Sequence, residues 1–455
     1  MSGRLAGVRA AVVTLGCDKN LVDAETMLGK LRADGAELVG GIAGADLVVL
    51  NTCAFIADAV SESYRKALEI SALRRSGAAR AFIVTGCMPE RFRDKLPGKL
   101  PDADAFLGTG EYDRIADTAA RLLGAGQAEP PAEAPRVLST AGYAFLKIAE
   151  GCDNRCAYCK IPAIRGRYKS RPIPDLAAEA EYLARRGAAE LVLVAQDTTE
   201  YGRDIYGGRE LPGLIRALSG VSGVRWIRLM YCYPERVTPE LIAEMASNPK
   251  VCRYIDMPVQ HVSDSVLAAM GRRGGRAVLE AAITALRAAM PDIAIRTTLM
   301  TGFPGETEED FETLKRFVRE TRFDRLGVFA FSPEKGTAAC RMGGQVERRE
   351  SGRRRGEIMR AQQRISAENN REMVGSVITA LVTGAGADNP NTIIGRTYRD
   401  APDVDGAVIA SASDALTTPA SGEIRPGAFV RIKITGSDDY DLFGDVIGMA
   451  MDDEI

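Results

Sequence analysis

Short apolar runs alternate with helical segments through most of the chain, and this alternation limits the possible folds more than any other feature. In residues 1–125 the apolar runs are Ala10–Leu15, Leu47–Leu50, Phe82–Val84 and Ala105–Leu107. Helical patterns lie between them at Leu21–Ala33, Ile56–Leu73 and Tyr112–Leu123. Alternation of this kind favours a parallel sheet with crossover helices. We therefore predict an α/β domain over residues 1–125.

A second and longer series follows a segment rich in Ala, Pro and Glu, Ala125–Arg136, which predicts a linker over residues 126–140. The next strand candidates are Phe145–Ala149, Leu191–Val194, Trp226–Met230, Tyr254–Met257, Ile293–Leu299 and Leu326–Phe331. Six such units indicate a full or partial (β/α) barrel within residues 141–375. The Arg-rich helical pattern Gln345–Met373 has no following strand, so we expect it to pack outside the barrel.

The last 80 residues change character. Short β-like runs at Ser376–Leu381, Val408–Ala410, Phe429–Ile434 and Val446–Met449 predict a small all-β barrel or sandwich over residues 376–455. This segment holds 13 acidic and 5 basic residues, a net charge of −8, whereas the whole chain carries only −2. The net charge of −2 for the whole chain argues against a nucleic-acid-binding protein that is basic throughout.

Counts of two residue types exclude several chemistries. The 455 residues include one histidine, His261, so a zinc site built on several histidines is impossible. Nine cysteines are present, and the first residues turn polar too early for a secretory signal. There is also no run of 18 apolar residues, so we expect a cytoplasmic protein without a membrane span. Clustered cysteines in a reducing compartment point to metal or redox chemistry.

The strongest chemical signal is a C-x3-C-x2-C motif formed by Cys152, Cys156 and Cys159. It follows a predicted strand, so it belongs to a loop at the carboxyl end of the barrel, where active sites of this fold lie. Three thiolates on one loop can hold three irons of a [4Fe–4S] cluster and leave the fourth without a protein ligand. The alternatives are three unrelated cysteines or a zinc knuckle that lacks a ligand.

Three further cysteines share one position in the N-terminal domain. Cys17, Cys53 and Cys87 each come just after an apolar strand. In an open parallel sheet, ligand sites form outside the carboxyl ends of the strands. The three thiols are therefore expected to converge on one edge, where they could hold a second cluster with an open iron. The alternative is three unrelated buried cysteines, a common fate of free Cys.

The motifs together resemble the radical S-adenosylmethionine methylthiotransferase family. The resemblance rests on TLGCDKNLVDAE, NTCAFI, VTGC, GCDNRCAYCKIPAIRG and TGFPGETEEDF, and it covers nearly the whole chain. It implies an N-terminal cluster domain, a radical barrel and a C-terminal TRAM-like domain. The motifs IDMPVQH, RLMYCYP and GRTYRDAPDVDG look most like the branch that modifies an aspartate of small-subunit ribosomal protein twelve. One departure is Asp18, which stands where the family has proline.

The resemblance also implies cofactors and roles. The cluster on Cys152, Cys156 and Cys159 would bind S-adenosylmethionine and, after receiving one electron, release a radical that removes hydrogen from the substrate. The cluster on Cys17, Cys53 and Cys87 would carry sulfur, methylated by a second S-adenosylmethionine, to the resulting carbon radical. The implied partners are a basic ribosomal protein or the small ribosomal subunit, and a reduced flavodoxin or ferredoxin-type electron donor.

Other residues are candidates for weaker reasons. Tyr158 could touch the adenine of the cofactor, although packing under the cysteine loop is an equal alternative. The loop containing Gly302 and Gly305 follows a strand and could let the backbone approach the cofactor, unless it is an ordinary strand-to-helix turn. Arg296 could face the cofactor or the substrate, with a structural salt bridge as the alternative.

Further positions have mainly structural interpretations. His261 and the pair Gln196–Asp197 follow barrel strands and could face the site, but a structural role is at least as expected for each. The remaining cysteines lack cluster spacing and are expected to be buried thiols; they are Cys232, Cys252 and Cys340. The run Arg353–Arg355 is expected to lie on a solvated helix face, and a contact with the ribosome is the less expected alternative.

Three functions remain open on sequence alone. Methylthiolation of a protein aspartate competes with methylthiolation of a tRNA adenosine, and with a non-catalytic electron carrier that holds two iron–sulfur clusters. RNA binding draws most of its affinity from Lys and Arg on phosphates. A C-terminal domain at −8 repels phosphate and attracts a basic protein, which favours the protein substrate. An electron carrier usually ligates every iron of its clusters, so two sets of three cysteines fit it poorly.

Overall fold

The computed structural model describes residues 3–125, 135–386, 391–412 and 424–451. The predicted linker falls largely on residues 126–134, which lie outside the described residues. The chain forms two compact units. The first contains residues 1–139 together with 150–154 and 159–168, and the second contains 140–149, 155–158 and 169–455.

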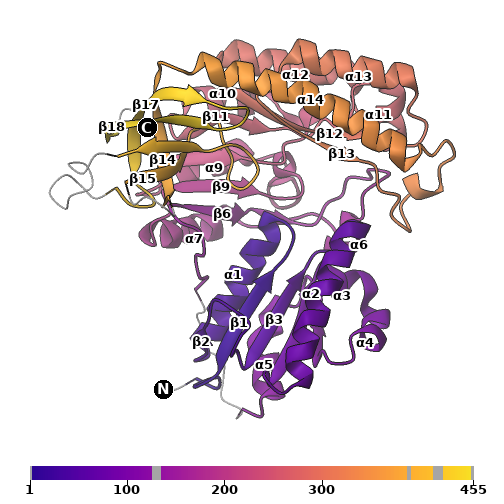
Figure 1. The fold of residues 1–455 in the computed structure, drawn as a ribbon, viewed down its shortest axis with the longest axis vertical. Helices are drawn as coiled ribbons and strands as arrows, with labels where there is room; N and C mark the ends of the chain where they lie inside the picture. The colour runs from indigo at the N-terminus through magenta and orange to yellow at the C-terminus, as the bar shows by residue number, and fades with distance from the viewer. Residues whose placement is uncertain (1–2, 126–134, 387–390, 413–423, 452–455) are drawn as a thin grey trace. The chain divides into compact units, whose positions relative to one another are not determined.

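The first unit is built on a five-stranded parallel sheet with strand order β2-β1-β3-β4-β5 (Figure 1). The strands are β1 (Arg9–Thr14), β2 (Glu37–Leu38), β3 (Leu47–Thr52), β4 (Ala81–Gly86) and β5 (Ala105–Leu107). The helices are α1 (Asp18–Ala33), α2 (Ala57–Arg75), α3 (Cys87–Phe92), α4 (Leu96–Lys99), α5 (Ile115–Leu122) and α6 (Ile161–Arg165). Every residue of β3 and β4 is buried, because helices cover both faces of the sheet.

The second unit contains a six-stranded parallel sheet with order β13-β12-β11-β10-β9-β6. Its strands are β6 (Tyr143–Lys147), β9 (Glu190–Val194), β10 (Trp226–Leu229), β11 (Val251–Asp256), β12 (Ala294–Thr301) and β13 (Arg325–Ala330). The longer helices between them are α7 (Ile173–Arg185), α9 (Leu211–Ser219), α10 (Pro239–Ser247), α12 (Gly275–Ala289) and α13 (Glu308–Thr321). The first and last strands are not paired with each other, so the sheet is a partial barrel, one of the two predicted forms.

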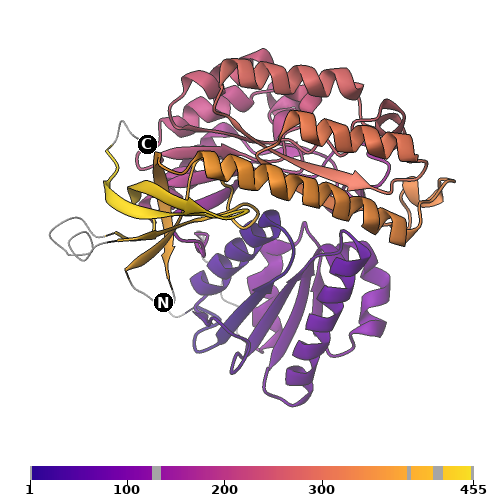
Figure 2. The same ribbon diagram turned by 45° about the horizontal axis from the view of Figure 1, so that its top comes forward.

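Shorter elements complete this unit. They are β7 (Ala149–Glu150), β8 (Lys169–Ser170), α8 (Arg203–Tyr206) and α11 (Asp264–Met270). The predicted Arg-rich helix is α14 (Arg348–Glu372), which packs along β13, β12 and α13 (Figure 2). Its buried face carries Ile358 and Ile365 together with polar residues such as Gln362, whose amide donates to the Phe323 carbonyl at 2.7 Å.

The C-terminal segment forms a closed five-stranded barrel in the order β14-β15-β16-β18-β17. Its strands are β14 (Val377–Ala385), β15 (Thr392–Arg396), β16 (Val408–Ser411), β17 (Phe429–Ser437) and β18 (Leu442–Met449). The sequence did not predict β15, since Thr392–Arg396 is short, contains Gly395 and comes directly after the residues Asn-Pro-Asn. Closure leaves no free sheet edge, and alternate residues of β17 and β18 fill the interior.

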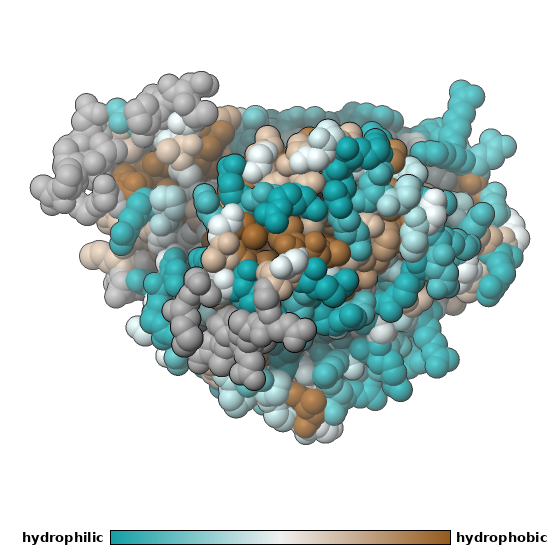
Figure 3. Space-filling model, turned by 90° about the horizontal axis from the view of Figure 1, so that it is seen from below, coloured by the Kyte–Doolittle hydropathy of each residue, from teal (hydrophilic) through white to brown (hydrophobic). Residues whose placement is uncertain are grey.

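Among the described residues, no helix has both the length and the apolar character needed to cross a membrane. The face of the molecule in Figure 3 is mainly hydrophilic, with a small apolar area near its centre.

Candidate functional site

The three N-terminal cysteines follow three neighbouring strands of the first sheet. Cys17 caps α1 just after β1, Cys53 follows β3 directly, and Cys87 is the first residue of α3 after β4. These strands are adjacent and parallel, in the order β1-β3-β4, so their carboxyl ends meet at one edge. Contact between the loops is close, because a Cβ added at Gly16 would lie 2.7 Å from the Cβ of Cys53. The backbone at Gly16 also has φ +97°, which favours glycine.

Burial and nearby charges affect the pKa values of two of the three thiols. Burial raises the pKa of Cys87 to about 11, Arg165 opposes this shift, and Cys17 and Cys53 add to it. Burial also raises the pKa of Cys53, and the neighbouring Cys17 again contributes. Cys17 is exposed, Cys53 is half-buried and Cys87 is buried. In the described part of the chain, no three His, Cys, Asp or Glu side chains already stand at the spacing of metal ligands.

Two residues that sequence analysis missed surround these thiols. The Asn20 side chain is fully buried, and its Nδ2 donates to the carbonyls of Leu15 at 2.7 Å and Thr52 at 3.1 Å. Its Oδ1 faces Cys87, whose Sγ lies 3.9 Å away. Arg165, at the end of α6, places Nη2 at 3.7 Å from the same Sγ. Asn20 follows Cys17 by three residues on α1, which is the only signal in the sequence that could have identified it.

The second group of cysteines lies on the loop after β7. The Cys152 amide donates to the Gly166 carbonyl at 3.1 Å, so this loop folds back on residues 166–167. Gly151 has φ +75° and a Cβ there would fall 2.1 Å from the Arg167 carbonyl oxygen, which makes glycine necessary. Two donors point at the sulfurs, namely Asn154 Nδ2 at 3.4 Å from Cys152 Sγ and the Ile161 amide at 3.4 Å from Cys159 Sγ.

Cys156 has a different neighbour. Its Sγ lies 3.7 Å from the hydroxyl oxygen of Tyr233. The ring of Tyr233 carries the guanidinium of Arg272 at 4.3 Å and that of Arg236 at 5.1 Å, which fixes the position of the phenol. The next residue, Ala157, donates to the Met270 carbonyl at 2.8 Å and accepts from the Ala339 amide at 2.9 Å.

The donor chemistry of both groups fits an iron–sulfur cluster. Each group offers three thiols and no histidine, and N–H or O–H donors of the kind that stabilise cluster sulfurs lie within 4 Å of Cys87, Cys152, Cys156 and Cys159. Three protein ligands leave one iron of a [4Fe–4S] cluster open to an exogenous ligand.

The side chain of Tyr158 packs against the loop that contains Gly302 and Gly305. Its ring packs edge-on against Phe303, with centroids 6.4 Å apart and an interplanar angle of 84°. Phe303 packs in turn on Phe331, with centroids 5.4 Å apart. The cysteine loop and the loop after β12 therefore share one apolar cluster, which also includes Met270 and Ala339.

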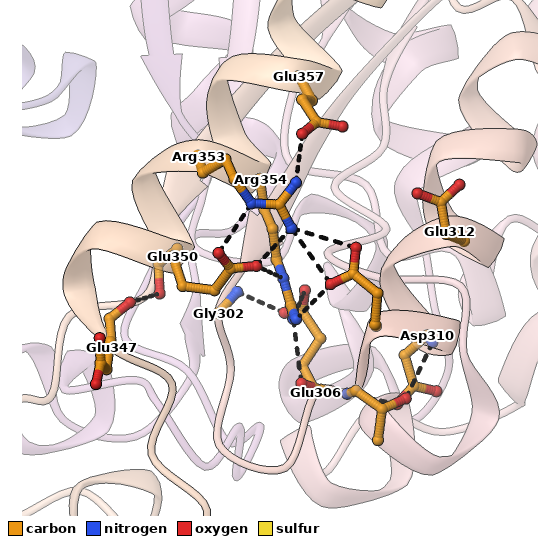
Figure 4. A network of polar contacts seen from close by, with 12 residues as sticks. Gly302, Glu306, Asp310, Glu312, Glu347, Glu350, Arg353, Arg354 and Glu357 are labelled. Carbon is orange, nitrogen blue, oxygen red and sulfur yellow. Dashed lines mark hydrogen bonds and ion pairs between the residues drawn. The ribbon is translucent and has the colours of Figure 1, made fainter.

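A buried ion pair holds the loop after β12 (Figure 4). Glu306 accepts the amides of Gly302 at 2.5 Å and Phe303 at 3.1 Å, and its other oxygen pairs with Arg354 at 2.9 Å. Burial raises the pKa of Glu306, and Arg354 opposes that shift. Gly302 has φ +76° and lies against α14, where a Cβ would meet the Ser351 hydroxyl at 1.8 Å. Gly305, with φ +85°, has open space around it.

Two arginines that the sequence singled out form ion pairs; for Arg296 this is one of the two stated alternatives, and for Arg354 it corrects the expected solvated position. Arg296 is the third residue of β12 and pairs with Asp256 at 2.7 Å and with Asp405 at 3.2 Å. The geometry therefore favours the structural salt bridge over the cofactor contact. In the run Arg353–Arg355, Arg354 is buried and paired with Glu306, so only part of the run lies on a solvated face.

The other candidates occupy structural positions. His261 is fully buried, its Nδ1 accepts the Ser263 amide at 3.0 Å, and burial lowers its pKa to about 4. Asp197 is buried after β9, accepts a hydrogen bond from the Thr199 hydroxyl at 2.7 Å and forms an ion pair with Arg236. Cys232 and Cys252 are buried, whereas Cys340 is half-buried.

Family models match three parts of the chain. The radical SAM superfamily matches residues 146–318, the uncharacterized protein family UPF0004 matches residues 9–108, and the TRAM domain matches residues 374–447. The first match runs from the end of β6 through β12 and stops before β13, the second covers the whole first sheet, and the third covers the C-terminal β-barrel as far as the middle of β18.

Curated relatives match almost the full length. A protein of Lachnoclostridium phytofermentans named ribosomal protein uS12 methylthiotransferase RimO is 45% identical over 95% of this chain and 98% of its own. A protein of the same name from Geobacter sulfurreducens is 43% identical over 96% of this chain and 98% of its own. Among solved structures, the radical S-adenosylmethionine methyltransferase TsrM of Kitasatospora setae, with cobalamin and a [4Fe–4S] cluster bound, shares the fold. The TM-score is 0.54 at 16% identity, over 83% of this chain and 81% of that chain.

Proposed function

The chain belongs to the RimO family of methylthiotransferases, and from this premise we propose that it transfers a methylthio group to the β-carbon of an aspartate in ribosomal protein uS12. The observation that carries the proposal is the match at 45% identity along 95% of the chain. Cys17, Cys53 and Cys87 belong to the segment that resembles UPF0004, and Cys152, Cys156 and Cys159 belong to the segment that resembles the radical SAM superfamily. The domain boundaries that we propose are 1–125, 126–140, 141–375 and 376–455.

The family uses two [4Fe–4S] clusters and S-adenosylmethionine. We assign one cluster to Cys152, Cys156 and Cys159 and the other to Cys17, Cys53 and Cys87. When bound, these groups supply the radical chemistry that opens an unactivated C–H bond, for which no general base suffices, and the sulfur and methyl that replace the hydrogen.

The residues of the chain contribute position and an apolar environment. Backbone hydrogen bonds from Cys152 to Gly166 and from Ala157 to Met270 hold two points of the cysteine loop. The Glu306–Arg354 pair holds the turn at Gly302. The rings of Tyr158 and Phe303 form an apolar contact, and Tyr158 directly precedes Cys159 in the sequence. Preorganisation of this kind lowers the cost of orienting cofactor and substrate. We assign Tyr158, Gly302 and Gly305 to the cofactor side of the site.

Charge on the C-terminal domain supports a protein substrate over tRNA. The domain carries a net charge of −8, and the exposed face of β18 presents Phe443, Asp445, Ile447 and Met449. An apolar strip with acidic neighbours suits a basic protein segment and repels a phosphate backbone. We propose uS12, free or in the small ribosomal subunit, as the partner, and a reduced flavodoxin or ferredoxin-type protein as the electron donor.

The proposal is tested with the full-length chain reconstituted anaerobically with iron and sulfide. Dithionite, S-adenosylmethionine and purified uS12 are added, and the products are analysed for 5′-deoxyadenosine and for the mass increase of one methylthio group on uS12. We expect both products. Parallel reactions with the small ribosomal subunit and with tRNA identify the form of the substrate. Modification of tRNA alone would overturn the assignment of the substrate.

Cysteine variants separate the roles of the two sets. The intact chain should bind about eight irons, and replacing either set of three by Ala should leave about four. Without Cys17, Cys53 and Cys87, formation of 5′-deoxyadenosine should persist while methylthio transfer is lost. Without Cys152, Cys156 and Cys159, both should be lost. A chain that binds two clusters but never forms 5′-deoxyadenosine would instead be an electron carrier.

A further inference from the structure

Arg165 is a buried arginine that belongs by sequence to the C-x3-C-x2-C segment, six residues after Cys159, yet contacts a cysteine of the other set. Its side chain is 2% exposed. Nη1 binds the carboxylates of Asp23 at 2.9 Å and Glu150 at 3.1 Å. Nη2 binds Asn20 Oδ1 and lies 3.7 Å from Cys87 Sγ. The two edges of the guanidinium thus serve different partners.

The orientation of Arg165 is determined by its surroundings. Asn20 uses both hydrogens of its amide on the carbonyls of Leu15 and Thr52, so its oxygen must face Arg165 and Cys87. Asp23 lies one turn further along α1 and is itself buried, which holds Nη1 in place. A planar guanidinium can serve a carboxylate and a sulfur at once, whereas the single ammonium of lysine cannot.

The charge of Arg165 lies next to a sulfur. Its Nη2 is 3.7 Å from Cys87 Sγ, and the side chain is almost completely shielded from solvent. In a low-dielectric interior, a hydrogen bond from a cation to sulfur stabilises the more negative state of that sulfur and of anything bound to it. Hydrogen bonds to cluster sulfurs and nearby charge are two of the factors that set the reduction potential of an iron–sulfur centre.

We propose that Arg165 is a positioning residue which donates a hydrogen bond to the sulfur of Cys87 and raises the reduction potential of the metal centre held by Cys17, Cys53 and Cys87. It thereby ties the segment that follows the C-x3-C-x2-C motif to the other cysteine set. The inference rests on the cluster assignment of the proposed function, and it adds a residue that neither the cysteine motifs nor their spacing indicates.

The test measures a potential instead of catalysis. In the full-length chain, Cys152, Cys156 and Cys159 are replaced by Ala, so that only the N-terminal centre is present. Its midpoint potential is determined by anaerobic titration with electron paramagnetic resonance detection. Arg165→Gln should shift the midpoint to a more negative value, and Arg165→Lys should shift it less, because lysine keeps the charge but cannot reach both Asp23 and Cys87.

Arg167→Gln is the matched control. Arg167 lies two residues away with its side chain 90% exposed, and it pairs with Asp153 instead of a sulfur. The same loss of charge at that position should leave the midpoint unchanged, because solvent screens it. Equal midpoints for the parent, Arg165→Gln and Arg165→Lys, each with about four irons bound, would overturn the role of Arg165. Absence of iron in the parent itself would instead overturn the cluster assignment.

A further variant guards against misfolding, since Arg165→Gln leaves the buried Asp23 without its cation. The double variant Asp23→Asn, Arg165→Gln removes both charges together. Its midpoint should also be more negative than that of Asp23→Asn alone, and identical midpoints would contradict the proposal. In the reverse background, Cys17, Cys53 and Cys87 are replaced by Ala and only the other centre is present. There Arg165→Lys should shift the midpoint potential by less than it does in the first background. A larger shift there would mean that Arg165 acts on the other centre.

Discussion

The Arg228 guanidinium and the Glu190 carboxylate form a fully buried ion pair inside the partial barrel, with Nε and Oε1 2.6 Å apart and neither side chain exposed. The second oxygen of Glu190 pairs at 2.5 Å with Arg396, which ends β15 of the C-terminal barrel. Arg228 also donates to the Thr397 carbonyl at 3.2 Å. One carboxylate therefore joins the two parts of the second unit, and although burial raises its pKa, the two arginines hold that pKa below the usual value.

Replacing Glu190 by Gln should lower the free energy of unfolding by about 3–5 kcal/mol, because Arg228 and Arg396 would stay buried without a counter-charge. Urea titration followed by circular dichroism measures the change. Glu181→Gln is the control, since that carboxylate is 57% exposed and pairs with an exposed Arg185, and it should change the value by less than about 1 kcal/mol. Equal effects of the two substitutions would refute the argument.

Phe429→Ala should both destabilise the second unit and change its fluorescence. Phe429 begins β17 and packs edge-on against Trp226 of β10, with centroids 4.8 Å apart. Trp226 is the only tryptophan in the chain, so the tryptophan emission reports on the surroundings of this one ring. We expect a red-shifted emission maximum and a loss of about 3–5 kcal/mol in unfolding free energy. An unshifted spectrum would show that the C-terminal barrel does not cover Trp226.

Alanine at Gly302 should be more harmful than alanine at Gly305. Both residues have positive φ, so each substitution costs about 1–2 kcal/mol of backbone strain. Only at Gly302 would the new Cβ also overlap Ser351 of α14, which adds about 1–3 kcal/mol of overpacking. Thermal unfolding of the two variants compares them directly. A Gly305→Ala chain as unstable as Gly302→Ala would mean that strain, and not contact with α14, dominates at this loop.

Stability should fall as the pH decreases from about 6.5, because His261 is buried in its neutral form. Its pKa in the folded chain is about 4, against about 6.5 in an unfolded chain, where it protonates freely. Asp310 raises this pKa and Arg354 lowers it, but burial is the larger effect. Between these two pH values His261 binds a proton in the unfolded chain but not in the folded chain. Acidification over this range should therefore lower the free energy of unfolding by about 3 kcal/mol.

Urea titrations at pH 7, 6 and 5 measure this slope, and His261→Gln is the comparison. No other histidine is present, so the variant should show a smaller decrease over the same range. An identical decrease in both chains would assign the pH dependence to carboxylates instead.

Most strands and helices were predictable because their signal is local. The runs around Leu47–Leu50 and Phe82–Val84 are apolar throughout, as strands covered on both faces must be, and the structure places β3 and β4 there. The prediction failed at β15, whose five residues gain their strand conformation from pairing with β14 and β16. It also failed for Arg354, since a charged residue in a sequence shows no sign of the carboxylate that will face it.

The sequence by itself determined the chemistry of this protein. Two sets of three cysteines, placed by strand order and by spacing, provide the thiols that we propose as metal ligands, and this information lies in residue types and in the period of the apolar pattern. Tertiary structure decided what surrounds those sulfurs. Asn20, Arg165 and Tyr233 lie beside these sulfurs, although they come from distant segments of the chain. Asn20 and Arg165, for example, are hydrogen-bonded to each other across a separation of 145 positions. Such contacts depend on how helices and strands pack in three dimensions, and side-chain packing over that separation leaves no periodic trace in the sequence.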